Sequence, residues 1–186
     1  INYIANDYIG FSPNRRIKKL QAYTLVPNDK SYKRVDATQI SDYSELGDYF
    51  YDDQMTRKVS FPAITEGSKT VVKYDIEMNS PYDWGIYYFT SGLPVANGKF
   101  TVSFPANVKL NYYLFGLEKE KIIFSEEKKK NTINYTWTYT NGSHFKRSND
   151  GLSSHYYFPH ILIHVAEYDS AGIAKRVFKN NDDLYN

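Results

Sequence analysis

Apolar and polar side chains alternate along several short segments, and this is the feature that most limits the possible folds of the chain. In segment 132–140, Ile133, Tyr135, Trp137 and Tyr139 fall on one side, while asparagine and threonine fall on the other. A period of two residues is typical of a β-strand with one buried face. The same pattern covers these further segments: 16–26, 71–78, 99–104 and 159–168. Such strands without helical periods between them predict an all-β chain that forms an antiparallel two-sheet sandwich.

Turn residues between these segments predict two hairpins. A Glu-Gly-Ser turn at 66–68 suggests that 57–64 pairs with 70–78. The charged run 126–131 precedes 132–140 and is expected to be the solvated tip of a second hairpin.

Composition excludes several classes of protein. The 186 residues include no cysteine, which rules out a disulfide framework, a thiolate nucleophile and a cysteine zinc site. With 23 Lys+Arg against 21 Asp+Glu, the net charge of +2 is not that of a nucleic-acid-binding protein. The longest apolar stretches, 86–89 and 161–165, are far shorter than the roughly 18–20 residues that span a bilayer. No cofactor is expected.

Histidine spacing in the second half of the chain resembles a metal motif at first sight. On a strand, however, His160, Leu162 and His164 share one face, and a rise of about 3.3 Å per residue places the two histidines roughly 13 Å apart. Both cannot reach one zinc ion at about 2.1 Å. We therefore expect two histidines on the solvent face of a sheet and no metal site.

Candidate catalytic groups are equally sparse. Ser153, Ser154 and His155 supply the residue types of a nucleophilic site without a recognisable motif. Carboxylates occur as neighbours, whose side chains point apart on a strand or loop, at Asp52-Asp53, Glu126-Glu127 and Asp182-Asp183. The sequence predicts no catalytic residue, although acids that converge in a cleft of an independent hydrolase remain an alternative.

Aromatic clusters are the remaining candidates for a site. They occupy 82–89, 112–115 and 156–158, and consecutive rings on a strand cannot all lie on one buried face. Exposed rings form platforms for sugars, peptides or a partner domain. Trp84, Tyr87 and Tyr88 are the predicted binding residues, and the alternative is that these rings belong to the core.

Several segments together resemble one family. They read as follows in this chain: LQAYT at 20–24, PNDK at 27–30, VSFPAI at 59–64, EGS at 66–68, VKYDIE at 72–77, VSFP at 102–105, and YTW at 135–137 ahead of Pro159. Over 16–165 the chain is similar to the domain of unknown function that precedes transglutaminase-like domains in exported bacterial proteins. Residues 1–15 match poorly, so the family's first strand is either missing or supplied by residues 3–11.

The resemblance implies an immunoglobulin-like β-sandwich, one domain over residues 1–168, and a tail at 169–186. That tail would lead into a missing downstream transglutaminase-like domain, and Asp182, Asp183 and Leu184 resemble the start of its first helix. The family's Cys-His-Asp triad lies in that later domain, so no catalytic residue is carried over. The usual context implies a periplasmic, cell-surface or secreted protein of a Gram-negative bacterium.

The function expected from these features is that of a non-catalytic accessory or interaction module. It would pack, within one polypeptide, on a transglutaminase- or protease-like domain. The alternative is a carbohydrate- or peptide-binding module that uses exposed aromatic residues.

Overall fold

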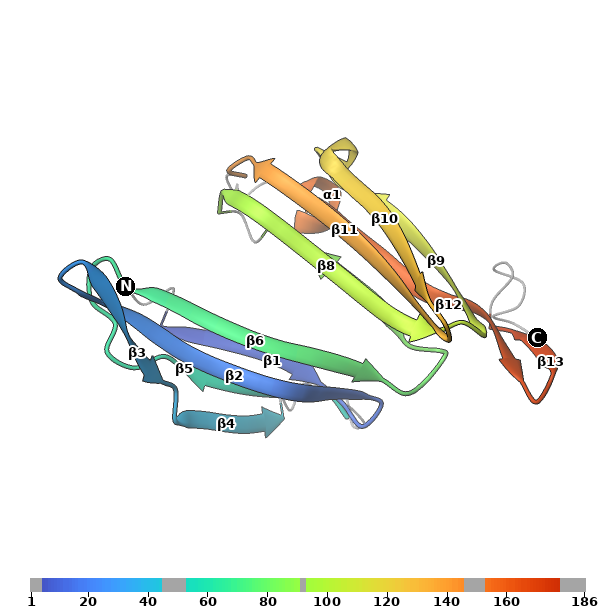
Figure 1. Ribbon diagram of the computed structural model, residues 1–186, viewed down its shortest axis with the longest axis horizontal. Coiled ribbons are helices and arrows are strands. Elements are labelled where there is room, and N and C mark those ends of the chain that lie inside the picture. The colour runs from blue at the N-terminus through green and yellow to red at the C-terminus, as the bar shows by residue number, and fades with distance from the viewer. Residues whose placement is uncertain (1–4, 45–52, 91–92, 146–152, 178–186) are drawn as a thin grey trace. The chain divides into compact units, whose positions relative to one another are not determined.

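The computed structural model describes residues 5–44, 53–90, 93–145 and 153–177, and these residues are mainly strands (Figure 1). The strands are β1 Asn6–Phe11, β2 Arg15–Asn28, β3 Ser31–Asp36, β4 Gln39–Ser44, β5 Met55–Ser60, β6 Lys69–Met78, β7 Trp84–Tyr88, β8 Val95–Pro105, β9 Val108–Phe115, β10 Ile122–Lys129, β11 Thr132–Gly142, β12 His160–Ser170 and β13 Ile173–Arg176. Two single turns of helix accompany them, η2 Lys119–Lys121 and α1 Ser154–Tyr157. Every strand pair is antiparallel, which confirms the all-β prediction.

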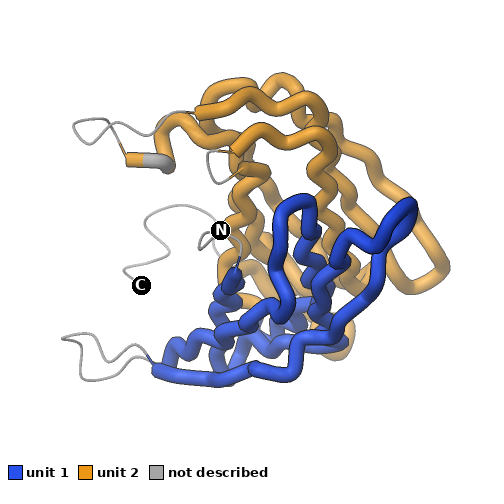
Figure 2. The backbone as a smooth tube through the Cα atoms, turned by 90° about the vertical axis from the view of Figure 1, so that its left-hand side faces the viewer, with its two compact units in different colours: residues 1–80 blue, residues 81–186 orange. Residues whose placement is uncertain are grey.

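The chain divides into two compact units, residues 1–80 and 81–186 (Figure 2). The single domain predicted over 1–168 stays a prediction, as does the tail after it. Within the expected tail, β13 pairs with the end of β12 and closes a hairpin. The helix start predicted at 182–184 lies outside the described residues. No helix in the described part of the chain has the length and apolar character needed to cross a membrane.

Unit 1 contains two three-stranded sheets, with strand orders β1-β5-β4 and β3-β2-β6. One hydrophobic cluster draws on both sheets, with Ile9, Ala22, Val59 and Phe61 buried at its centre. Strand β5 pairs with β1 and β4, while β6 pairs with β2. The predicted hairpin between 57–64 and 70–78 is therefore wrong, because the intervening segment connects two different sheets. Strand β1 shows that a strand is present in the poorly matching N-terminal segment.

Unit 2 also has two sheets. One has the order β10-β11-β8; in the other, β12 pairs with β9 along one edge and with β7 and then β13 along the other. Their shared cluster contains Trp137 and Tyr139, both fully buried, together with Ile161 and Ile163 of β12. The alternation along β11 thus marks a core face, as the sequence predicted.

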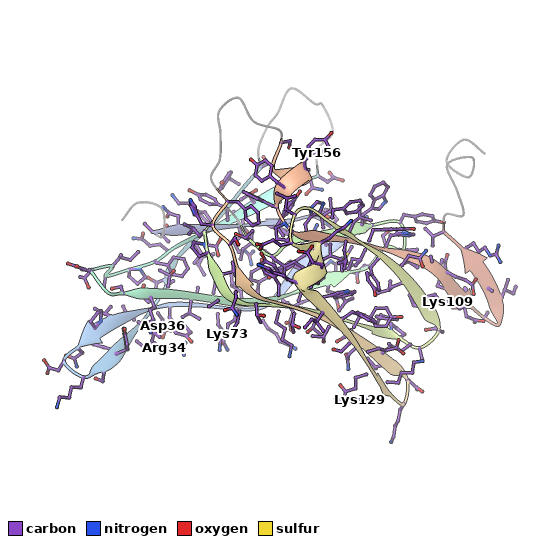
Figure 3. The ribbon with its side chains drawn as sticks, turned by 90° about the horizontal axis from the view of Figure 1, so that it is seen from above. Arg34, Asp36, Lys73, Lys109, Lys129 and Tyr156 are labelled. Atoms are coloured by element: carbon purple, nitrogen blue, oxygen red, sulfur yellow. The ribbon has the colours of Figure 1, made fainter. Side chains whose placement is uncertain are left out.

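The hairpin between β10 and β11 is confirmed by its register, in which Lys129 lies opposite Thr132. Most of the charged run predicted as a loop belongs to β10 itself, and Lys129 lies at its end (Figure 3). Its exposed ion pairs, Lys128 with Glu126 and Lys129 with Glu127, contribute little to stability.

Glu118 fastens the crossover between the two sheets of unit 2. It follows β9 in a left-handed backbone conformation, and its carboxylate accepts hydrogen bonds from Lys121 Nζ at 2.8 Å and Tyr139 Oη at 2.5 Å. Ser143 donates both its hydroxyl, at 2.5 Å, and its backbone N–H, at 3.3 Å. These donors, Lys121 first, then Ser143 and Tyr139, lower the pKa of Glu118 to about 2. The crossover is thereby held against the end of β11.

The first prediction concerns acid stability. A carboxylate whose pKa is lowered by folding stabilises the protein above its unfolded pKa of about 4.5, and this contribution is lost as pH falls towards 2. Glu118→Gln should lower the free energy of unfolding by about 1–2 kcal/mol at pH 7. The difference from wild type should shrink between pH 4.5 and 2 in urea denaturation. Glu120→Gln, an exposed neighbour, is the control, and a pH-independent difference for Glu118→Gln would contradict the assignment.

The second prediction concerns Gly116, which has φ 86° just after β9. A Cβ atom there would lie 2.2 Å from the backbone oxygen of Phe158, which cannot move aside as a side chain can. Gly116→Ala should destabilise the protein by about 2 kcal/mol or more, measured by urea denaturation. Gly172, with φ 80° and nothing within 4 Å of its added Cβ, is the matched control. Gly172→Ala should show only the conformational cost, about 1 kcal/mol, and equal losses at both glycines would refute the steric argument.

Candidate functional site

Strand β7 separates the three predicted binding residues onto two faces. Tyr87 points into unit 2, where it stacks on Phe100 at 4.4 Å with an interplanar angle of 9° and packs against the core. Its burial raises the pKa of its hydroxyl. Trp84 and Tyr88 lie on the other side of the strand with Ile86, because side chains alternate along a strand. The structure therefore places Trp84 and Tyr88 on the same face of β7 and Tyr87 in the packing interior.

The neighbouring strands extend the outward side of β7 into a wider surface. In the register, His160 lies between Tyr88 and Phe115, Leu162 between Ile86 and Tyr113, and His164 between Trp84 and Asn111. We call this set of nine side chains the aromatic face: Trp84, Ile86, Tyr88, Asn111, Tyr113, Phe115, His160, Leu162 and His164. None of the nine is Asp, Glu, Lys or Arg.

Several of these side chains are exposed despite their apolar character. Trp84 is 55% exposed and Tyr113 is 50% exposed, and Ile86 and Phe115 are exposed as well. Tyr156 on α1 is exposed as well (Figure 3). A contiguous group of exposed apolar side chains on one sheet indicates a contact surface, whereas single exposed apolar residues do not.

His160 differs from the expectation that both histidines face solvent. It does share a face with His164, as the alternation predicted, but it is only 7% exposed. Its ring stacks between Tyr88 at 4.8 Å and Phe115 at 5.2 Å. Its Nδ1–H donates to the carbonyl oxygen of Phe158 at 2.9 Å. The cross-strand rings cover this histidine, an effect that depends on the neighbouring strands and not on the local pattern.

The remaining rings have different environments. His164 lies parallel to Tyr113, with centroids 6.0 Å apart and an interplanar angle of 9°. The Tyr88 hydroxyl hydrogen-bonds to Nδ1 of His155, which ties α1 to β7. Burial raises the pKa of Tyr88, so this hydroxyl stays neutral. Among the described residues no ring pairs with the Trp84 indole, and more than half of this side chain is exposed.

The opposite outer face of unit 2 is polar and hydrogen-bonds to itself. Thr101 and Thr136 of β8 and β11 are 3.1 Å apart, and Ser103 donates to Asn134 at 2.6 Å. Such groups are satisfied within the sheet and in water. The two outer faces of the same unit thus differ sharply in chemistry, and only the aromatic face has the composition of an interface centre.

The described residues offer few groups that could support catalysis or bind a metal ion. They contain no group of three or more His, Asp or Glu side chains that could hold a metal ion. His155, the histidine nearest in sequence to Ser153 and Ser154, bonds to Tyr88. The prediction that Trp84 and Tyr88 bind a ligand stays a prediction. The sequence also offered the 112–115 cluster, but only the register shows that residues of β9 and β12 lie beside β7.

A solved structure shares the fold. The crystal structure of a putative protease from Parabacteroides distasonis ATCC 8503 matches with a TM-score of 0.68 and 17% sequence identity, over 86% of this chain and 32% of that chain. The chain therefore spans about a third of the length of that neighbour. No curated protein matches.

Residues 2–146 match the family described as Domain of Unknown Function with solved-structure structure (DUF3857). This match covers more than half of the chain and includes strands of both compact units. The chain belongs to the DUF3857 family.

Proposed function

We propose that this chain is a non-catalytic accessory module of a larger exported protein, and that its aromatic face packs against a protease- or transglutaminase-like catalytic domain of the same polypeptide. The observation that carries the proposal is the partly exposed aromatic face on β7, β12 and β9, which contains no Asp, Glu, Lys or Arg. Interface centres are depleted in charged residues and enriched in aromatic ones, as this surface is.

The energetics favour a covered face. Exposed apolar area costs about 25 cal/mol per Å² relative to burial, so Trp84, Tyr113 and Phe115 would all gain from a partner. Stacking already fixes His160 between Tyr88 and Phe115, which limits the side-chain entropy lost on docking.

The comparisons support the part of the proposal that places this chain in a longer protein with a catalytic domain. A neighbour of the same fold is called a putative protease and is about three times as long as the part that this chain covers. The resemblance to the domain that precedes transglutaminase-like domains points the same way, with an immunoglobulin-like sandwich and a periplasmic or cell-surface location. A fold alone does not carry a function, so this support is analogy.

A second candidate function is glycan or peptide binding by the same face. The observation that favours it is the exposure of the Trp84 indole, because sugars and peptides stack on exposed aromatic rings. The rings of Tyr88, His160 and Phe115 cover one another and offer less free area.

The third prediction tests the proposal through tryptophan labelling. With 5-fluorotryptophan, this chain should give two ¹⁹F resonances, one from exposed Trp84 and one from buried Trp137, assigned with Trp84→Phe. In the longer polypeptide that contains the catalytic domain, the Trp84 resonance should lose its solvent isotope shift while that of Trp137 stays unchanged. Trp84→Ser with Tyr113→Ser should restore mobility between the domains, whereas Thr101→Ser with Thr136→Ser on the opposite face should not.

Three results would argue against the proposal. Equal solvent exposure of Trp84 in both polypeptides would mean that the face does not dock. Peptidase or acyl-transfer activity of this chain alone would show that it is catalytic. A saturable shift of the Trp84 resonance with oligosaccharides or peptides would favour the second candidate.

A further inference from the structure

A small cavity lies within unit 1, between β1 and β6. Each is the outer strand of its own sheet, and the cavity, of about 160 Å³, lies between them. Its lining includes Gly10 of β1, Tyr74 and Ile76 of β6, Gln54, and Arg15 at the start of β2. All of these residues belong to unit 1 and are unrelated to the aromatic face.

Arg15 is the cation of this cavity. It lies on the same side of β2 as Ile17, which packs against the core of unit 1, and its Nε is buried without a hydrogen-bond partner. Leaving a buried donor unsatisfied costs about 1–3 kcal/mol, and more for a charged group. The folded chain thus holds a guanidinium N–H that lacks an acceptor.

The two acids of the neighbouring strand β6 are engaged elsewhere. Asp75 and Glu77 of β6 pair with Lys19 at 3.0 Å and Lys18 at 3.1 Å. Among the described residues no carboxylate forms an ion pair with Arg15. The charge of Arg15 is therefore available to a ligand.

A second arginine in the same unit shows what Arg15 lacks. Arg57 donates through Nε and Nη2 to the two carboxylate oxygens of Asp42, both at 2.7 Å. This bidentate pair satisfies its guanidinium and lowers the pKa of Asp42. The planar fork of a guanidinium matches a carboxylate, and a cavity of about 160 Å³ has room for one on a short chain.

We propose that this cavity binds a carboxylate group, with Arg15 as the anchoring residue. The carboxylate bonds to the terminal Nη atoms of Arg15, which are not buried as Nε is, and Gln54 and Tyr74 border it. It belongs either to a small free acid or to a peptide, and both present the same chemistry to Arg15.

The fourth prediction is tested by nuclear magnetic resonance of the whole 186-residue chain, through the Nε–Hε signal of Arg15. At constant ionic strength, acetate should shift this signal saturably, whereas acetamide and chloride should not. Acetyl-Ala-Ala-Ala with a free carboxylate should do the same, and its carboxamide should not. Tighter binding of the peptide than of acetate would identify a polypeptide as the source, and equal binding a free acid.

Variants complete the test. Arg15→Gln should weaken acetate binding roughly tenfold or more, and Arg15→Lys, which keeps the charge but not the fork, by less. Arg16→Gln is the matched control, because exposed Arg16 donates its Nε to the carbonyl oxygen of Pro13 at 3.0 Å. An Arg15 signal in the wild type that acetate leaves unmoved, or that acetamide moves equally, would overturn the proposal without any variant.

Discussion

The structure of unit 2 depends on the central position of β12. This strand pairs with β9 along one edge and with β7 along the other, and its alternation therefore sets the chemistry of both faces of a three-strand surface. Ile161 and Ile163 enter the core, while His160, Leu162 and His164 point the other way. The fit is close: a Cβ on Gly85, opposite Ile163, would lie 2.6 Å from that side chain. A shift of register by one residue would exchange the core and the aromatic face.

The two outer faces of unit 2 differ in chemistry, and the proposed docking surface rests on this contrast. On β8 and β11, threonine, serine and asparagine side chains bond to one another and need no partner. On β7, β12 and β9, the stacked rings cover one another from solvent only in part, and Trp84 and Tyr113 remain about half exposed. Of these two faces, only the aromatic one leaves several large apolar side chains exposed to solvent.

Local pattern predicted some elements well and others poorly, for physical reasons. The alternation of β6, β11 and β12 was readable because the side-chain period of a strand is a local property. The pairing of β5 was not, since β5 and β6 lie close in sequence but in different sheets. Of the predicted binding residues, Trp84 and Tyr88 share a face while Tyr87 stacks on Phe100, a separation that the strand period itself implies.

The sequence by itself determined the all-β class, the hairpin of β10 and β11, and the family, because alternation and turn residues are encoded in neighbouring positions. Only the tertiary structure decided which side chains on each strand face are buried, exposed or unpaired. Burial of His160 requires Tyr88 and Phe115 from strands far apart in the chain, and the unpaired Arg15 Nε appears only when β1 and β6 border one cavity. Both depend on strand pairing between distant segments, which local sequence does not encode.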